Sequence, residues 1–164
     1  MFYMEHILIP TDFTTASLQP VARLAEAFPE RSFTVVLTHV FDTPDGITEL
    51  LRLHRSIPVS ILFSDEMRAA CKRLKDQYGT TIRSIIFKPV YGSGTAVLKQ
   101  ALEANRIDTV LYDEHYAYTR PHRCSADMHR WLKKAPVQVL KAGALRKVVP
   151  AAPKETAAYA EVII

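Results

Sequence analysis

The sequence predicts a single open α/β domain, in which a doubly wound parallel sheet of five strands carries helices on both faces. Short runs rich in β-branched residues alternate with helical patterns along most of the chain, and these runs are almost continuously apolar. Strands that are covered on both faces have this pattern, whereas half-exposed strands alternate apolar and polar residues. The five runs are residues 7–9, 33–40, 82–87, 109–111 and 137–140.

Between the first two predicted strands, the sequence predicts a helix that begins at Ser17. A serine in this position can cap the free backbone N–H groups of the first turn, and Pro20 lies where a missing N–H costs nothing. The inward stripe of this helix is predicted to contain Leu18, Val21, Leu24, Ala25 and Phe28.

Three further helices complete the alternation of strands and helices. The second is predicted to begin at its cap Ser64 and to stop before Gly79, and the third to begin near Thr95. A short fourth helix is predicted from about Ser125 to the pair Ala135–Pro136. Because strand–helix–strand crossovers in one sheet are right-handed, this order predicts the doubly wound architecture.

Composition excludes several classes of protein. Of the 164 residues, 48% are hydrophobic and 23% charged, which is typical of a globular domain. A net charge of +4 is too small an excess for a dedicated nucleic-acid binder. Two cysteines, Cys71 and Cys124, are too few for a disulfide framework. No apolar run approaches the roughly 20 residues that a membrane helix needs. We therefore expect a cytoplasmic protein with no membrane or nucleic-acid partner.

Two stretches do not fit the alternation. Residues 41–63 form a long insertion, and the chain after Gly143 contains a linker-like mixture of Ala, Pro and Lys. We therefore divide the chain into an α/β domain over residues 1–142 and a C-terminal extension over residues 143–164. The extension either wraps loosely on its own domain or adds a strand to the sheet edge of a partner subunit.

A ligand site is expected outside the carboxyl ends of the strands. Four acidic residues are predicted to gather at this edge of the sheet: Asp12, Asp42, Asp113 and Glu114. The basic excess lies elsewhere along the chain, since residues 1–60 contain four basic and seven acidic residues and residues 113–164 contain nine and five. Most of that last excess belongs to the final helix and the tail. The sequence therefore predicts an acidic ligand edge.

Several segments together resemble the universal stress protein family. The segments are Ile7–Thr14 (ILIPTDFT) followed by a Leu/Ala helix, Val36–Val40 (VLTHV), the turn glycine Gly92, the strand and loop Asp108–His115, and Trp131–Leu140 (WLKKAPVQVL). Their order and spacing match over about Glu5–Lys141, leaving out the insertion. The resemblance implies a five-stranded sheet in the order 3-2-1-4-5 and a homodimer formed through the fifth strand.

The resemblance also implies where a nucleotide would bind. Members that bind ATP hold it with the aspartate after strand one, with backbone groups at the end of strand two, and with a glycine loop. Asp12, with its neighbour Thr11, corresponds to the first of these elements, and Val40 corresponds to the second as a backbone position. Gly92 is added because it corresponds to the family's turn glycine before the third helix. We take these four residues as the candidate ligand-binding residues.

The glycine loop of the family is not matched. Its first two glycine positions fall on Asp113 and Tyr116, and its Gly-Ser pair falls near Ser125–Ala126. A phosphate cradle needs residues without Cβ, so that successive N–H groups can turn toward the anion. Like charges about 4 Å apart repel by roughly 1 kcal/mol in water, and by more near a low-dielectric surface. The sequence therefore argues against ATP or AMP as a cofactor. The alternative is a sensor that binds a nucleotide or other small ligand through Asp12 and the strand-two backbone.

Other constellations have weaker support. The segment Gly92–Thr95 is read as a tight turn capped by Thr95 rather than as an anion-binding nest. His115, His122, Cys124 and His129 match no zinc-site spacing and are read as loop residues.

A Cys124–His115–Asp113 triad has the required residue types but no supporting motif, and Cys71 is read as a core residue. The sequence therefore predicts a non-enzymatic stress-response domain without a metal or cofactor. We expect a homodimer that binds an unknown protein partner or small ligand.

Overall fold

The computed structural model describes residues 4–42, 62–92 and 94–146. Its main sheet has five strands, all parallel, in the order β4-β2-β1-β6-β7. Their bounds are β1 Glu5–Pro10, β2 Phe33–Thr38, β4 Ile82–Phe87, β6 Thr109–Tyr112 and β7 Gln138–Lys141. Counted over these five strands, the order is 3-2-1-4-5, so the predicted fold class and strand order are confirmed.

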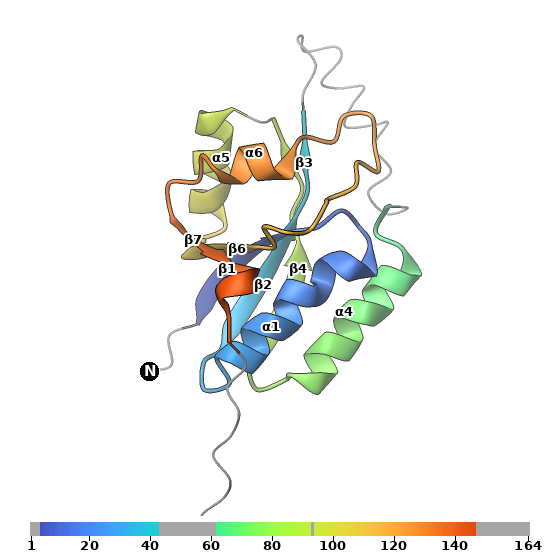
Figure 1. The fold of residues 1–164 in the computed structure, drawn as a ribbon, viewed down its shortest axis with the longest axis vertical. Coiled ribbons are helices and arrows are strands. Elements are labelled where there is room, and N and C mark those ends of the chain that lie inside the picture. Colours follow the sequence, from blue (N-terminus) through green and yellow to red (C-terminus); the bar gives the residue numbers. More distant parts are fainter. Residues whose placement is uncertain (1–3, 43–61, 93, 147–164) are drawn as a thin grey trace, which may run out of the picture.

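The helices cover both faces of the sheet (Figure 1). Helices α1 (Gln19–Ala27) and α4 (Asp65–Gln77) pack on one face, and α5 (Thr95–Ala104) and α6 (Met128–Leu132) on the other. The sheet therefore separates two hydrophobic cores, the first beneath α1 and α4 and the second beneath α5 and α6. Alternate residues of the central strand β1 point into each, since Ile7 and Ile9 belong to the first core and Leu8 to the second. This two-sided burial explains the continuously apolar strands. None of the described helices has the length and apolar character of a membrane span.

A second, two-stranded parallel sheet was not predicted. Strands β3 (Val40–Phe41) and β5 (Val90–Tyr91) continue the chain beyond β2 and β4, and each has only two residues. Runs this short have no readable periodicity, so they merge with the preceding strands in the sequence. Together they extend the sheet toward the edge where the candidate site lies.

Helices α1 and α6 both begin later than predicted. Helix α1 follows a 3-10 turn at Thr15–Leu18, and the hydroxyl of Ser17 contacts Thr14 O and Thr11 Oγ1 instead of capping the helix. Helix α6 begins at Met128 rather than near Ser125, with the side chain of Asp127 as its cap.

Thr95 is also not a cap, since it is the first residue of α5 and follows Gly94. The cap predicted at Ser64 is confirmed, with its hydroxyl accepting a hydrogen bond from Met67 N at 3.2 Å.

Several predictions lie outside the described residues. These are the structure of the insertion between residues 43 and 61, the conformation of Ser93 in the turn before α5, and the path of the extension from residue 147 onward. A short 3-10 helix, Ala142–Ala144, spans the start of the extension, and its first residue, Ala142, is buried in the core beneath α1 and α4.

Candidate functional site

The site begins where β1 ends and the chain turns sharply. Pro10 is the last residue of the strand, and Phe13 has a positive φ of 64°, which is uncommon for a residue with a large side chain. The ring of Phe13 packs against His39, with centroids 5.0 Å apart, and against Phe87, at 5.2 Å. The turn is therefore held by packing, and it places Asp12 at the carboxyl edge of the sheet.

Asp12 is 1% exposed and accepts five hydrogen bonds from this chain. Thr14 donates to Oδ1 from its backbone N at 3.2 Å and from its hydroxyl at 2.5 Å. The other oxygen, Oδ2, accepts from the Tyr116 hydroxyl at 2.8 Å, and from Thr119 through its N at 2.9 Å and its hydroxyl at 3.1 Å. Both carboxylate oxygens are therefore occupied by the protein, and three of the donors come from the loop after β6.

These donors also set the charge of the carboxyl group. Burial of Asp12 on its own raises its pKa, because desolvation disfavours the charged form. The hydrogen bonds from Thr14, Thr119 and Tyr116 stabilise the carboxylate and outweigh burial, so the pKa of Asp12 is lowered from 3.8. Asp12 is thus an ionised group whose solvent has been replaced by protein donors.

Thr11 and its partner His39 are fully buried beside Asp12. His39 Nδ1 lies 2.7 Å from the carbonyl oxygen of Thr11, and its Nε2 lies 2.8 Å from Ser125 Oγ. A carbonyl only accepts, so Nδ1 carries the proton, and Nε2 of the neutral ring accepts from the serine hydroxyl. Burial lowers the pKa of His39 and favours this neutral form. The hydrogen bond between His39 and Ser125 therefore holds the loop before α6 against the end of β2.

The backbone acceptor predicted at Val40 is also in use. Its carbonyl oxygen accepts a hydrogen bond from Ala126 N at 2.9 Å, and Asp42 N donates to Cys124 O at 2.6 Å. An isolated antiparallel bridge joins Phe41 to Ser125 between these two bonds. The segment at the predicted Gly-Ser position is therefore paired with β3.

Gly92 has a structural role that accounts for its residue type. Its φ is +109°, and an added Cβ would lie 3.2 Å from Val97 Cγ2. Its N–H donates to Phe41 O at 2.7 Å, which closes the small β3-β5 sheet. Gly92 therefore lies at the same edge as Asp12, and the fold itself requires a glycine there.

We expect Gly92→Ala to lower the free energy of unfolding by about 1–3 kcal/mol, because alanine at this φ is strained and crowds Val97. Gly94→Ala is the matched control. Its φ is −70° and the space around it is open, so the expected loss is less than about 1 kcal/mol. Urea unfolding measures both variants, and equal losses would contradict the strain at Gly92.

The acidic residues of the loop do not point where the sequence suggested. Glu114 accepts from Gly143 N at 3.3 Å, so its carboxylate lies toward the C-terminal extension. Asp113 accepts from His115 N at 3.0 Å within its own turn. The group that reaches Asp12 is instead the hydroxyl of Tyr116, which also lies 2.8 Å from Thr14 Oγ1.

The alternative chemistries receive no further support from the geometry. In residues 4–42, 62–92 and 94–146, no three His, Cys, Asp or Glu side chains form a group that could hold a metal ion. The ring of His115 is exposed and lies beside Glu114, 3.6 Å from Nε2 to Oε1. Within the same residues, no hydrogen bond joins Cys124 to His115. Cys71 packs against the first core, and burial raises the pKa of its thiol to about 11.

Comparison with known proteins gives matches in fold. No family model matches the chain, and no curated protein does. The crystal structure of hypothetical protein PH0823 covers 90% of this chain and 99% of its own, with 17% identity and a TM-score of 0.51. Universal stress protein UspA from Lactobacillus plantarum covers 89% and 99%, with 19% identity and a TM-score of 0.48. A universal stress protein in complex with cAMP covers 84% and 94%, with 14% identity and a TM-score of 0.45.

Several solved structures similar to this chain are universal stress proteins. At 17% identity, the likeness to PH0823 shows a shared fold and nothing more specific. That fold is the one the resemblance in sequence implied, down to the order of the five strands.

Sequence reasoning identified Asp12 but missed the groups that occupy it. Thr119 carried no signal, since a threonine in a loop of this length has no expected partner. Ser125 was predicted only as the approximate start of a helix and as a family position, and His39 only as part of the segment Val36–Val40 that resembles the family. A histidine at the end of an otherwise apolar strand was the available signal, because a buried ring needs partners for both nitrogens.

Proposed function

We propose that this protein is a universal stress protein-like domain that acts in a stress response without catalysis, and that it does not hold ATP through Asp12. The segments that resemble the family over Glu5–Lys141 support this assignment, as do the order of the five strands and the fold shared with PH0823. A protein partner or a small ligand would then carry its function.

The observation that carries the proposal is the occupation of the ligand edge by the chain itself. A nucleotide at Asp12 would have to displace Tyr116 Oη and both donors of Thr119. Hydrogen bonds to charged groups contribute about 1.5–3 kcal/mol each, so the displacement costs at least about 4 kcal/mol. Micromolar binding amounts to only about 8 kcal/mol in total. The cost therefore moves a micromolar dissociation constant into the millimolar range.

Calorimetric titration with Mg·ATP, AMP and adenosine tests the proposal. We expect no saturable binding of adenosine below about 1 mM, because adenosine has no phosphate and depends on the groups near Asp12 and Val40. Micromolar binding of adenosine that is lost in Asp12→Asn would overturn the proposal and would favour the nucleotide sensor. One universal stress protein structure is a complex with cAMP and another has AMP bound, and adenosine is the moiety that both ligands contain.

A homodimer through β7 is part of the proposal. This strand lies at one edge of the sheet and leaves Val139 36% exposed. The outer side of an edge strand presents backbone groups that a second copy can pair with. The other edge is formed by β4, where Ile86 is 40% exposed and so provides a matched control position.

We expect Val139→Asp to convert the dimer to a monomer and Ile86→Asp to leave it intact, since a charge buried without a partner weakens an interface strongly. Light scattering coupled to size-exclusion chromatography measures both variants at about 50 μM. A monomeric native protein, or dissociation by Ile86→Asp, would contradict this interface. The cytoplasmic location and the absence of a cofactor stay predictions.

A further inference from the structure

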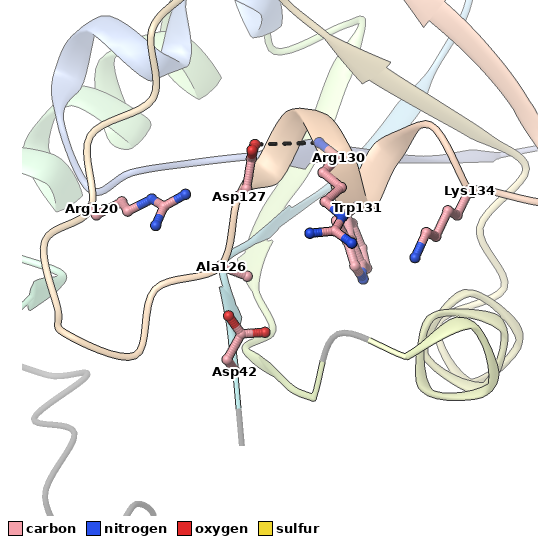
Figure 2. A pocket seen from close by; sticks show the side chains of 7 residues that line it. All are labelled: Asp42, Arg120, Ala126, Asp127, Arg130, Trp131 and Lys134. Carbon is pink, nitrogen blue, oxygen red and sulfur yellow. Dashed lines mark hydrogen bonds between the residues drawn. The ribbon is translucent and has the colours of Figure 1, made fainter. Parts of the chain in front are cut away.

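A pocket of about 350 Å³ lies on the side of α6, beside the end of β3. It is lined by three cationic side chains, Arg120, Arg130 and Lys134, together with Asp42, Asp127 and the ring of Trp131. Figure 2 shows the guanidinium groups of Arg120 and Arg130 and the amine of Lys134 directed into a common space, with the carboxylate of Asp42 beside it. Arg130 of α6 and Lys134 just after it therefore line the ligand edge, which corrects the expectation that the basic excess of this segment lies elsewhere.

The three positive charges have no carboxylate partner in the described part of the chain. The ion pairs among the described residues join other side chains. In the same part of the chain, the side chains of Arg120, Arg130 and Lys134 form no hydrogen bond. The carboxylate of Asp127 is turned to the backbone and accepts from His129 N at 3.1 Å and Arg130 N at 3.3 Å (Figure 2). Like charges gathered in this way repel one another, and an anion placed among them would remove the repulsion.

Trp131 supplies a second, independent indication of a ligand. Its side chain is 2% exposed, and its indole Nε1 is a buried donor that has no hydrogen-bond partner among residues 4–42, 62–92 and 94–146. Buried donors in folded proteins are nearly always satisfied, so an orphaned one in the wall of a pocket calls for an explanation. In Figure 2 the nitrogen lies at the end of the ring that points away from the α6 ribbon.

We propose that this pocket binds a small phosphate monoester, with Arg120, Arg130 and Lys134 as its cationic partners. Guanidinium groups match the oxygens of a phosphate in pairs, and an amine adds a compact third charge. The indole N–H of Trp131 would donate to a phosphate oxygen that reaches the wall of the pocket. The exposed carboxylate of Asp42 would accept from a hydroxyl group elsewhere on the ligand. Ala126, at the Gly-Ser position of the family's glycine loop, also lines the pocket, whereas Asp12, Asp113 and Tyr116 do not.

Fluorescence offers a direct test, because Trp131 is the single tryptophan of the chain. The native protein is titrated with glycerol 3-phosphate, inorganic phosphate, glycerol and KCl, with the ionic strength held constant. We expect a saturable change for the phosphate compounds, with a dissociation constant below about 1 mM, and no change for glycerol or KCl. Tighter binding of glycerol 3-phosphate than of inorganic phosphate would identify an ester as the ligand, and equal binding would identify the phosphate group alone.

Variants decide whether the binding belongs to this pocket. Arg130→Gln and Arg120→Gln should each weaken binding about tenfold or more, whereas Lys133→Gln should leave it unchanged. Lys133 is exposed on the same helix turn but does not line the pocket. All three positions are exposed, so these variants are expected to fold, which circular dichroism verifies. A response that follows ionic strength alone, or an equal loss in Lys133→Gln and Arg130→Gln, would overturn the proposal.

Discussion

Replacing Asp12 with alanine is expected to lower the free energy of unfolding by about 3–5 kcal/mol, one of the largest single effects in this chain. The carboxylate accepts hydrogen bonds from three residues, and its removal leaves their donors without an acceptor in a buried place. A donor left unsatisfied costs about 1–3 kcal/mol, although part of this cost is relieved when the exposed Thr119 turns to water. The loop after β6 should also become more mobile, since Asp12 holds it against β1.

Urea unfolding at pH 7 measures this loss, with Asp76→Asn as a control at an exposed acidic position on α4. The control should change the free energy of unfolding by less than about 0.5 kcal/mol. Asp12→Asn should give an intermediate loss, because the amide keeps one acceptor oxygen and places a donor opposite other donors. A loss below about 1 kcal/mol in Asp12→Ala would show that the five contacts do not hold the site closed.

Replacing His39 with alanine is expected to lower the free energy of unfolding by about 2–4 kcal/mol. The variant leaves the Thr11 carbonyl and the Ser125 hydroxyl without their buried partner. It also removes a ring that packs between Phe13 and Phe41, at centroid distances of 5.0 and 4.8 Å. Both losses fall on the contact that fastens the loop before α6 to the sheet.

His39 also makes stability depend on pH in a defined direction. Burial lowers the pKa of His39 below the ordinary value of 6.5, and the nearby His122 adds to this effect. The unfolded chain therefore takes up a proton at higher pH than the native protein does. Stabilisation by the neutral ring is complete above pH 6.5 and is lost as the pH falls below it. The lowered pKa of Asp12 acts in the same direction, but only as the pH falls below 3.8.

Unfolding free energies measured between pH 7.5 and 5 separate these two groups. Native protein should lose stability over this range, and His39→Ala should lose markedly less on acidification. His115→Ala is the matched control, because the ring of His115 is 84% exposed, and it should behave like the native protein. An unchanged pH dependence in His39→Ala would contradict the burial of a neutral histidine at this position.

The fold was predictable because it depends on patterns that are local in the sequence. Strands such as β1 and β2 are buried on both faces, so their apolar runs stand out, and Ser64 caps α4 as its position indicated. Helix starts were less predictable where a candidate cap had a stronger tertiary partner. Ser17 binds Thr11 instead of capping α1, and Ser125, the predicted start of the last helix, binds His39.

The candidate site was predictable only in part because its contacts join distant segments. Asp12 could be placed from its position after β1, but its partner Thr119 is 107 residues away in the chain and depends on the path of a loop. The basic pocket was missed for a related reason. Charge counted along the sequence assigned Arg130 and Lys134 to the last helix, and only the packing of α6 brings them to the ligand edge.

Amide hydrogen exchange followed by NMR tests the closed ligand edge most directly. We expect Ala126 and Thr119, whose N–H groups donate to Val40 O and Asp12 Oδ2, to exchange about 100-fold or more slowly than an unprotected amide. The neighbouring amide of Arg120, which forms no hydrogen bond with the described residues, should exchange fast. Adenosine should change none of these rates. Fast exchange at both Thr119 and Ala126, or protection that appears only when adenosine is added, would contradict a ligand edge that the chain itself occupies.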